Sequence, residues 1–122
     1  MSETEFLEEL SRRWPHSVAA SERSAATIKL VEDAVRQHPR SAHLWTLRGD
    51  LLQLTEDCPE YGLAEVGRSY RMAIKADPRF VGAYEEMGRF LAMVLGNRRK
   101  AARYLDKARR LRKSARNAER AQ

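Results

Sequence analysis

The chain has 122 residues, of which 43% are hydrophobic and 33% charged, and it carries a net charge of +6 at neutral pH. This length fits one domain with a modest core, and no apolar run approaches the roughly 18 residues that a membrane span requires. An acidic N-terminus without the apolar region of a signal peptide, and a single cysteine, Cys58, which cannot form an internal disulfide, favour a cytoplasmic protein.

The positive charge is concentrated near the C-terminus. Residues 97–122 contain eleven lysines and arginines against two acidic residues, a net charge of +9. Residues 1–96 contain twelve basic and fifteen acidic residues, a net charge of −3. The basic character therefore belongs to one segment and not to the whole protein.

The first half of the chain predicts three helices. Ser2 and Glu5 form a capping-box pattern that starts the first helix, and residues 15–23 predict a loop. Ser24 is expected to cap the second helix and Ser41 the third. Apolar residues follow each of these starts at helical spacing, and no strand pattern occurs.

The second half predicts three more helices. A long loop through Cys58 precedes a fourth helix over about residues 63–76. Asp77 and Pro78 are expected as the N-cap and first residue of a fifth helix that runs to Leu95. A glycine and an asparagine close the fifth helix, and the sixth continues without a breaker to the end of the chain. The apolar stripe expected on the sixth helix contains Ala101, Tyr104, Leu105, Ala108 and Leu111.

Two segments of the chain repeat each other 39 residues apart. Proline, a large aromatic residue, glycine and an aliphatic residue recur in the same order, at positions 39 and 78, 45 and 84, 49 and 88, and 52 and 91. Such a period is typical of stacked helical repeats. Gly49 and Gly88 are expected to admit a close neighbour, with Ala73 and Ala108 as the small partners. The large residues expected to fill the space between helix pairs are Trp45, Tyr70, Tyr84 and Leu105.

These segments resemble the tetratricopeptide repeat, whose pattern is W-x2-L-G-x2-Y, then A-x3-F, then P. The first copy reads Trp45-x2-Arg48-Gly49-x2-Leu52, then Val66-x3-Tyr70, Ala73 and Pro78. The second reads Tyr84-x2-Met87-Gly88-x2-Leu91, then Ala101, Leu105 and Ala108. Arg48 stands where the family usually has leucine. The resemblance implies an all-α, antiparallel helix-pair solenoid of about six helices, wound as a right-handed superhelix.

The resemblance also divides the single domain, residues 1–122, into segments. They are an N-terminal helix and loop (1–23), a partial repeat (24–40), a repeat with an extended inter-helix loop (41–78), a second repeat (79–113) and a basic C-terminal extension (114–122). Two clear repeats fall short of the roughly three that a stable array usually needs, which leaves a homodimer open.

The resemblance implies a non-catalytic protein-interaction module, an adaptor or scaffold that binds a peptide or helix in a concave groove. By register with the family, the residues that face this groove are His43, Thr46, Leu47, Asp50, Gln53, Gly82, Glu85, Glu86, Arg89 and Met93. Asp50, Glu85 and Glu86 would favour a basic or amphipathic ligand. Alternatively, they are ordinary solvated charges.

The basic surface of the last helix has three interpretations. Its residues include Arg98, Arg99, Arg103, Lys107, Arg110, Lys113 and Arg116. It can be a solubilising cap on the last repeat. It can also contact nucleic acid through its charge, without base stacking. The third interpretation is docking on an acidic protein, a membrane surface or another copy of the chain.

No catalytic, metal or cofactor site is expected. His16, His38 and His43 are isolated and lack metal-ligand spacing, and no phosphate-binding loop occurs. Glu85 and Glu86 are adjacent, so they diverge around a helix and do not share a proton.

Overall fold

The structure, a computed structural model, describes residues 1–15, 21–54 and 62–121. These residues form helices and no strand, which confirms the all-α prediction. The six helices are α1 (Glu3–Arg13), α2 (Ser21–Gln37), α3 (Ala42–Leu54), α4 (Leu63–Ala76), α5 (Val81–Met93) and α6 (Arg98–Arg120). The predicted long loop through Cys58 lies almost entirely outside the described residues.

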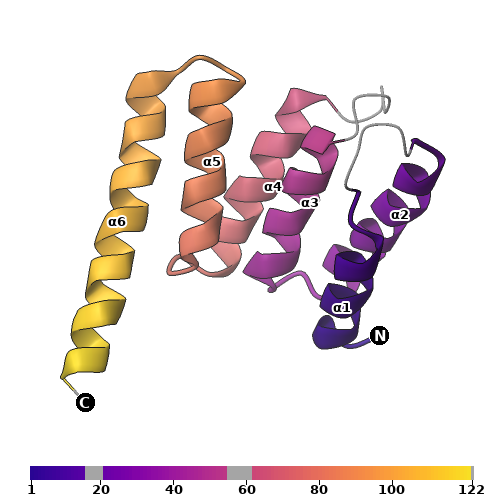
Figure 1. Cartoon of the computed structure of the whole chain (residues 1–122), viewed down its shortest axis with the longest axis horizontal. Coiled ribbons are helices and arrows are strands. Elements are labelled where there is room, and N and C mark those ends of the chain that lie inside the picture. Colours follow the sequence, from indigo (N-terminus) through magenta and orange to yellow (C-terminus); the bar gives the residue numbers. More distant parts are fainter. Residues whose placement is uncertain (16–20, 55–61, 122) are drawn as a thin grey trace.

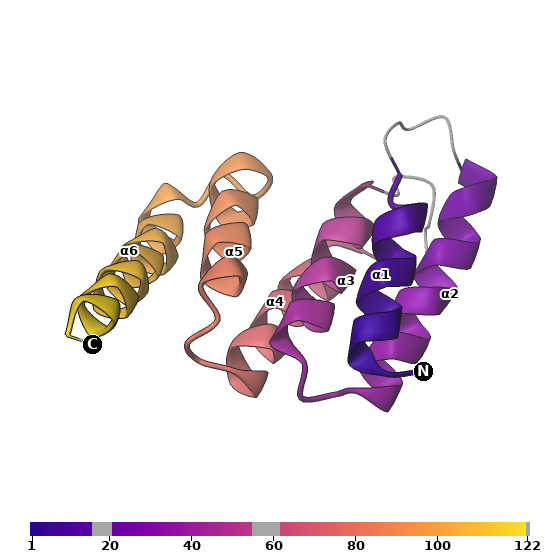
Figure 2. The same ribbon diagram turned by 60° about the horizontal axis from the view of Figure 1, so that its bottom comes forward.

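Helices α3 to α6 lie in a row that follows their order in the chain, and α1 and α2 lie together at the end of the row beside α3 (Figure 1). Each helix packs on the next, most extensively α3 on α4 and α5 on α6, and α3 also contacts α5. The N-terminus lies at the end of the row formed by α1 and α2, and the C-terminus lies at the opposite end, as the rotated view in Figure 2 also shows.

Three helix starts are capped by side chains. Ser2 Oγ accepts a hydrogen bond from the Glu5 N–H at 3.1 Å, and the Glu5 carboxylate accepts one from the Ser2 N–H at 3.0 Å, which confirms the capping box. Ser41 Oγ accepts from the Leu44 N–H at 3.2 Å, so Ser41 caps α3 as predicted. Asn97 caps α6 in the same way.

The predicted start of α2 at Ser24 is wrong, because the helix begins three residues earlier, at Ser21. The segment from Ser21 to Ser24 contains no proline or glycine, so nothing in it stops the helix from extending toward the N-terminus. Residues 16–20 of the predicted loop lie outside the described part of the chain.

The predicted start of α5 at Asp77 and Pro78 is also wrong. Asp77 instead follows the end of α4 with extended backbone (φ −146°, ψ 99°), the conformation that a following proline favours. Its side chain accepts a hydrogen bond from the Arg79 N–H at 3.0 Å, and its carbonyl accepts one from the Phe80 N–H at 3.1 Å. These bonds close a turn, and α5 begins only at Val81.

The predicted end of α5 at Leu95 lies two residues too far along the chain, since the helix ends at Met93. Gly96 reverses the chain in the left-handed region, at φ +67°, where glycine is favoured. The Asn97 N–H then donates to the Leu91 carbonyl at 2.8 Å, which satisfies an acceptor at the helix end. The Gly96–Asn97 closure itself is confirmed.

The apolar core forms two clusters along the row. The first joins α1, α2 and α3 and extends to Ala73 of α4 and Ala83 of α5. Its largest fully buried side chains are those of Phe6, Leu10, Leu44 and Leu51. The second joins the end of α3 to α4, α5 and α6, and its members include Leu52, Val66, Tyr70, Met87, Phe90 and Leu91. Core residues thus link every helix to its neighbours.

The two repeat glycines admit close neighbours, but the partners are not the predicted alanines. A Cβ atom on Gly49 would lie 2.5 Å from the Tyr70 ring, and one on Gly88 would lie 2.6 Å from the Leu105 side chain. A large residue of the second helix therefore fills the space above each glycine, and the predicted role of Ala73 and Ala108 as partners is wrong.

The repeat extends to hydrogen bonds that the sequence did not predict. Trp45 Nε1 donates to the Pro39 carbonyl at 2.9 Å, and the Tyr84 hydroxyl donates to the Pro78 carbonyl at 2.8 Å. Both aromatic residues reach back by six positions to the proline that precedes their helix. The two segments are therefore equivalent in contacts as well as in sequence.

Candidate partner-binding face

The residues that the family resemblance predicts to line a groove come from α3 and α5, two helices that contact each other. His43, Arg89 and Met93 are exposed, and Met93 has 83% of its surface accessible. The His43 ring lies against Phe80, with ring centroids 5.6 Å apart. The half-buried members are Leu47, Asp50, Gln53, Gly82, Glu85 and Glu86.

Thr46 does not belong to this exposed face, contrary to the prediction. Its residue surface is 5% exposed, and its hydroxyl donates to the Ala42 carbonyl at 2.8 Å. A threonine bonded to the carbonyl four residues earlier turns its hydroxyl along its own helix. Thr46 therefore has neither the exposure nor a spare donor with which to contact a partner.

A hydrogen-bonded group at the centre of the face joins α3 to α4. The buried Tyr70 hydroxyl donates to Asp50 Oδ1 at 2.7 Å and accepts from Gln53 Nε2 at 2.6 Å. Burial, followed by the charge of Asp50, raises the pKa of the Tyr70 phenol, so the hydroxyl stays protonated and acts as a donor to Asp50.

A second carboxyl, from α5, lies beside Asp50. Burial raises the pKa of the Asp50 carboxyl to about 7. The hydrogen bond from Tyr70 opposes this rise. The charge of Glu86, and a hydrogen bond between Asp50 and Glu86, raise the pKa further. A neighbouring carboxylate disfavours ionisation, so Asp50 is partly protonated near neutral pH and forms a hydrogen bond with Glu86. The pair joins α3 to α5.

Ion pairs extend this group to α6. Arg89 contacts Glu86 at 2.5 Å and Glu85 at 3.5 Å, both within α5. Arg112 of α6 contacts Glu85 at 2.5 Å. The carboxylates of Glu85 and Glu86 are therefore balanced by two arginines, and Asp50 is partly protonated. The face combines charges of both signs and is not uniformly acidic.

A second polar group lies around Arg48, which is 4% exposed. Its guanidinium binds Glu32 of α2, Glu65 of α4 at 3.1 Å and the Ser69 hydroxyl of α4 at 2.6 Å. Arg48 and Trp45 also lie 5.9 Å apart, within cation–π range. The arginine that departs from the family pattern thus ties α2, α3 and α4 together.

This second group borders a pocket of about 350 Å³ that Arg68 and Trp45 also line. Burial alone would raise the pKa of Glu65, but hydrogen bonds from Arg48 and Arg68 outweigh burial and lower it, so the carboxylate is charged. Arg48 is already bound by two carboxylates and a hydroxyl. The group has the properties of a structural ion-pair network.

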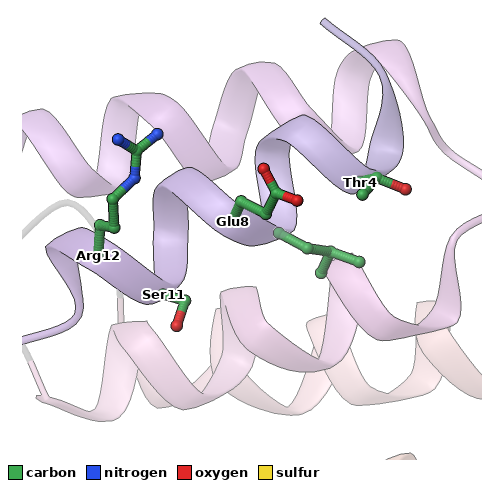
Figure 3. A pocket seen from close by; sticks show the side chains of 5 residues that line it. Thr4, Glu8, Ser11 and Arg12 are labelled. Carbon is green, nitrogen blue, oxygen red and sulfur yellow. The ribbon is translucent and has the colours of Figure 1, made fainter.

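A larger pocket, of about 480 Å³, lies along α1. Its lining residues are Thr4, Leu7, Glu8, Ser11 and Arg12. Figure 3 shows the four labelled side chains spread along the helix instead of converging on one point. A small-molecule site needs several polar groups aimed at one place, so this surface is not such a site.

The predicted basic residues surround α6. All seven are exposed except Lys107, which is half-buried, while Ala101 and Ala108 face the core. Near the C-terminus, Lys113 and Arg116 from the predicted set come together with other basic residues around a pocket of about 450 Å³. The same pocket is also lined by Arg109, Arg112, Asn117 and Arg120.

Residues 1–15, 21–54 and 62–121 contain no group of three or more His, Cys, Asp or Glu side chains that could hold a metal ion. None of their helices is long and apolar enough to cross a membrane. In comparisons with known proteins, no protein-family model matches the chain, and no curated protein matches its sequence.

Proposed function

We propose that the chain is a non-catalytic interaction module of the tetratricopeptide type, which holds a peptide or helix of a partner protein on the face of α3 and α5. The observation that carries the proposal is the equivalence of the two repeats. The bonds from Trp45 to Pro39 and from Tyr84 to Pro78 are the same, and each repeat glycine is covered by a large residue. This equivalence supports a stacked-repeat scaffold, whose exposed face is suited to binding.

The chemistry of the face favours a partner with both charged and apolar groups. Glu85, Glu86 and Arg89 offer paired charges, and Met93 at the end of α5 is a flexible and exposed apolar contact. Charge pairs of both signs select a partner by complementarity more than they add affinity. As part of the proposal we place the module in the cytoplasm, because its one cysteine suits a reducing compartment.

The test is a double charge reversal, Glu85→Lys with Glu86→Lys. Tagged wild-type and variant proteins are used to capture partners from nuclease-treated lysate of the source cells, with quantitative mass spectrometry as the readout. We expect a stoichiometric protein partner that the wild type retains and the double variant loses. Thermal unfolding by circular dichroism checks that both proteins are folded.

The matched control is Asp33→Lys with Asp106→Lys, on α2 and α6. This control changes the net charge by the same amount as the test variant, but at residues that lie outside the proposed binding face. The control should retain the partner. If the double variant on α5 retains it as well as the wild type does, or if the control loses it equally, the proposed face is not the binding surface.

A further inference from the structure

The C-terminal part of α6 stands free of the rest of the protein. Ala108 is the last buried residue of α6, and every residue from 112 to 121 is exposed. Figure 1 shows this end of α6 projecting beyond α5. The nine residues from 112 to 120 correspond to about 13 Å of helix at about 1.5 Å per residue. A straight single helix with no flanking element is therefore available to a ligand.

The last three turns of α6 carry a dense basic surface around a pocket. The residues that line this pocket all come from α6, and they are Arg109, Arg112, Lys113, Arg116, Asn117 and Arg120. Arg109 is paired with Asp106, and Arg112 with Glu85. Lys113, Arg116 and Arg120 have no ion pair within the described parts of the chain. The surface thus presents five cationic side chains over three turns of helix. Three of these side chains make no ion pair in the described structure.

The composition of this helix favours a polyphosphate over the other anionic partners that such a surface could bind. Leu111 is the only large apolar residue after Leu105, and no aromatic residue follows Tyr104. Protein interfaces are anchored most often by Trp, Tyr and Arg side chains in well-packed pockets, and helices that lie in a membrane surface need a broad apolar face. The free helix has no aromatic anchor and no broad apolar face, so its affinity comes from the charge of its arginines and lysines. A polyphosphate backbone provides such affinity through the release of counterions.

We propose that residues 109–120 of α6 bind double-stranded DNA by lying in the major groove and contacting phosphates on both sides, without reading the sequence. An α-helix about 10–12 Å across fits the B-form major groove, which is about 12 Å wide. The corresponding groove of double-stranded RNA is too narrow and deep for side chains to read. Single strands are held mainly by aromatic stacking, and residues 109–120 contain no aromatic residue. At about 100° per residue, the exposed Arg110 and Arg116 point about 120° apart around the helix, toward opposite walls of the groove.

The first measurement is fluorescence anisotropy of the full chain with a labelled random-sequence DNA duplex of about two helical turns. Five phosphate contacts predict that log affinity falls with log salt concentration at a slope of about −4.5. Raising the salt concentration from about 50 to about 200 mM should therefore weaken binding by several hundred-fold. Absence of binding at the lower salt concentration would overturn the proposal.

A triple variant, Lys113→Glu with Arg116→Glu and Arg120→Glu, tests whether DNA binds to this part of α6. These residues are exposed and make no ion pair in the described structure, so the fold should persist, which circular dichroism verifies. We expect affinity at low salt to fall at least a hundred-fold and the salt slope to fall toward about −2.

The control carries three reversals at the exposed residues Arg71, Lys75 and Arg79, which change the net charge equally. It should keep the salt slope of the wild type. An equal loss in the control would mean that binding follows overall charge. Equal affinity for a double-stranded RNA of the same length would exclude insertion into the major groove. Equally effective displacement of the DNA by a polyglutamate peptide of matched charge would assign the surface to an acidic protein.

Discussion

Asp50→Asn is expected to make the protein more stable at neutral and alkaline pH. In the wild type, the buried carboxyl of Asp50 lies between the Tyr70 hydroxyl and the Glu86 carboxyl, and its pKa is raised to about 7. Asparagine has the same shape. Its oxygen can accept from Tyr70, and its amide can donate to Glu86, so the variant reproduces the protonated state of the wild type.

The magnitude follows from proton linkage. Because the folded-state pKa is raised, the folded protein holds this proton more tightly than the unfolded chain does. The stability that Asp50 contributes is complete below about pH 4 and is lost as the pH rises through about 7. The difference between about 7 and the ordinary value of 3.8 corresponds to about 4 kcal/mol. About 3 kcal/mol of this is lost between about pH 5 and about pH 8.

The assay is urea unfolding followed by circular dichroism at a series of pH values over this range. The free energy of unfolding of Asp50→Asn, minus that of the wild type, should increase by about 3 kcal/mol from the acidic to the alkaline end. Asp106→Asn, at an exposed carboxyl of α6, serves as the control and should show no such increase. A difference for Asp50→Asn that stays constant or shrinks with pH would refute the raised pKa of Asp50.

Two further predictions concern the repeat contacts. Gly49→Ala should lower the free energy of unfolding by about 1–3 kcal/mol, because its Cβ would lie 2.5 Å from the Tyr70 ring. Gly67→Ala, which meets only the end of a flexible side chain, should be neutral or stabilising by up to about 1 kcal/mol, and urea unfolding that gave the opposite order would contradict this reasoning. Trp45→Phe and Tyr84→Phe should each lower the free energy of unfolding by about 1 kcal/mol or more, because each removes the hydrogen bond to a proline carbonyl. Thermal melts in which only one of the two variants is destabilised would show that the repeats are not equivalent.

The sequence by itself determined the helices and their repeat. Apolar spacing and the capping residues Ser2 and Ser41 located most of the helix boundaries, because caps and breakers act over a few residues. Its error at Asp77 arose because an aspartate can either cap a helix or close a turn, and its error at Ser24 arose because no breaker stops α2 from extending to Ser21. The choice between these local structures depends on backbone geometry that spacing does not record.

Only the tertiary structure decided which polar side chains meet. Register placed Asp50 and Glu86 on the same face but did not predict that they touch, and their contact results from the packing of α3 on α5. Burial of Thr46 and the neutralisation of Glu85 by Arg112 likewise depend on neighbouring helices. Long-range contacts and burial set the charge of a carboxyl, and these are properties of the packed helices that the order of residues does not reveal.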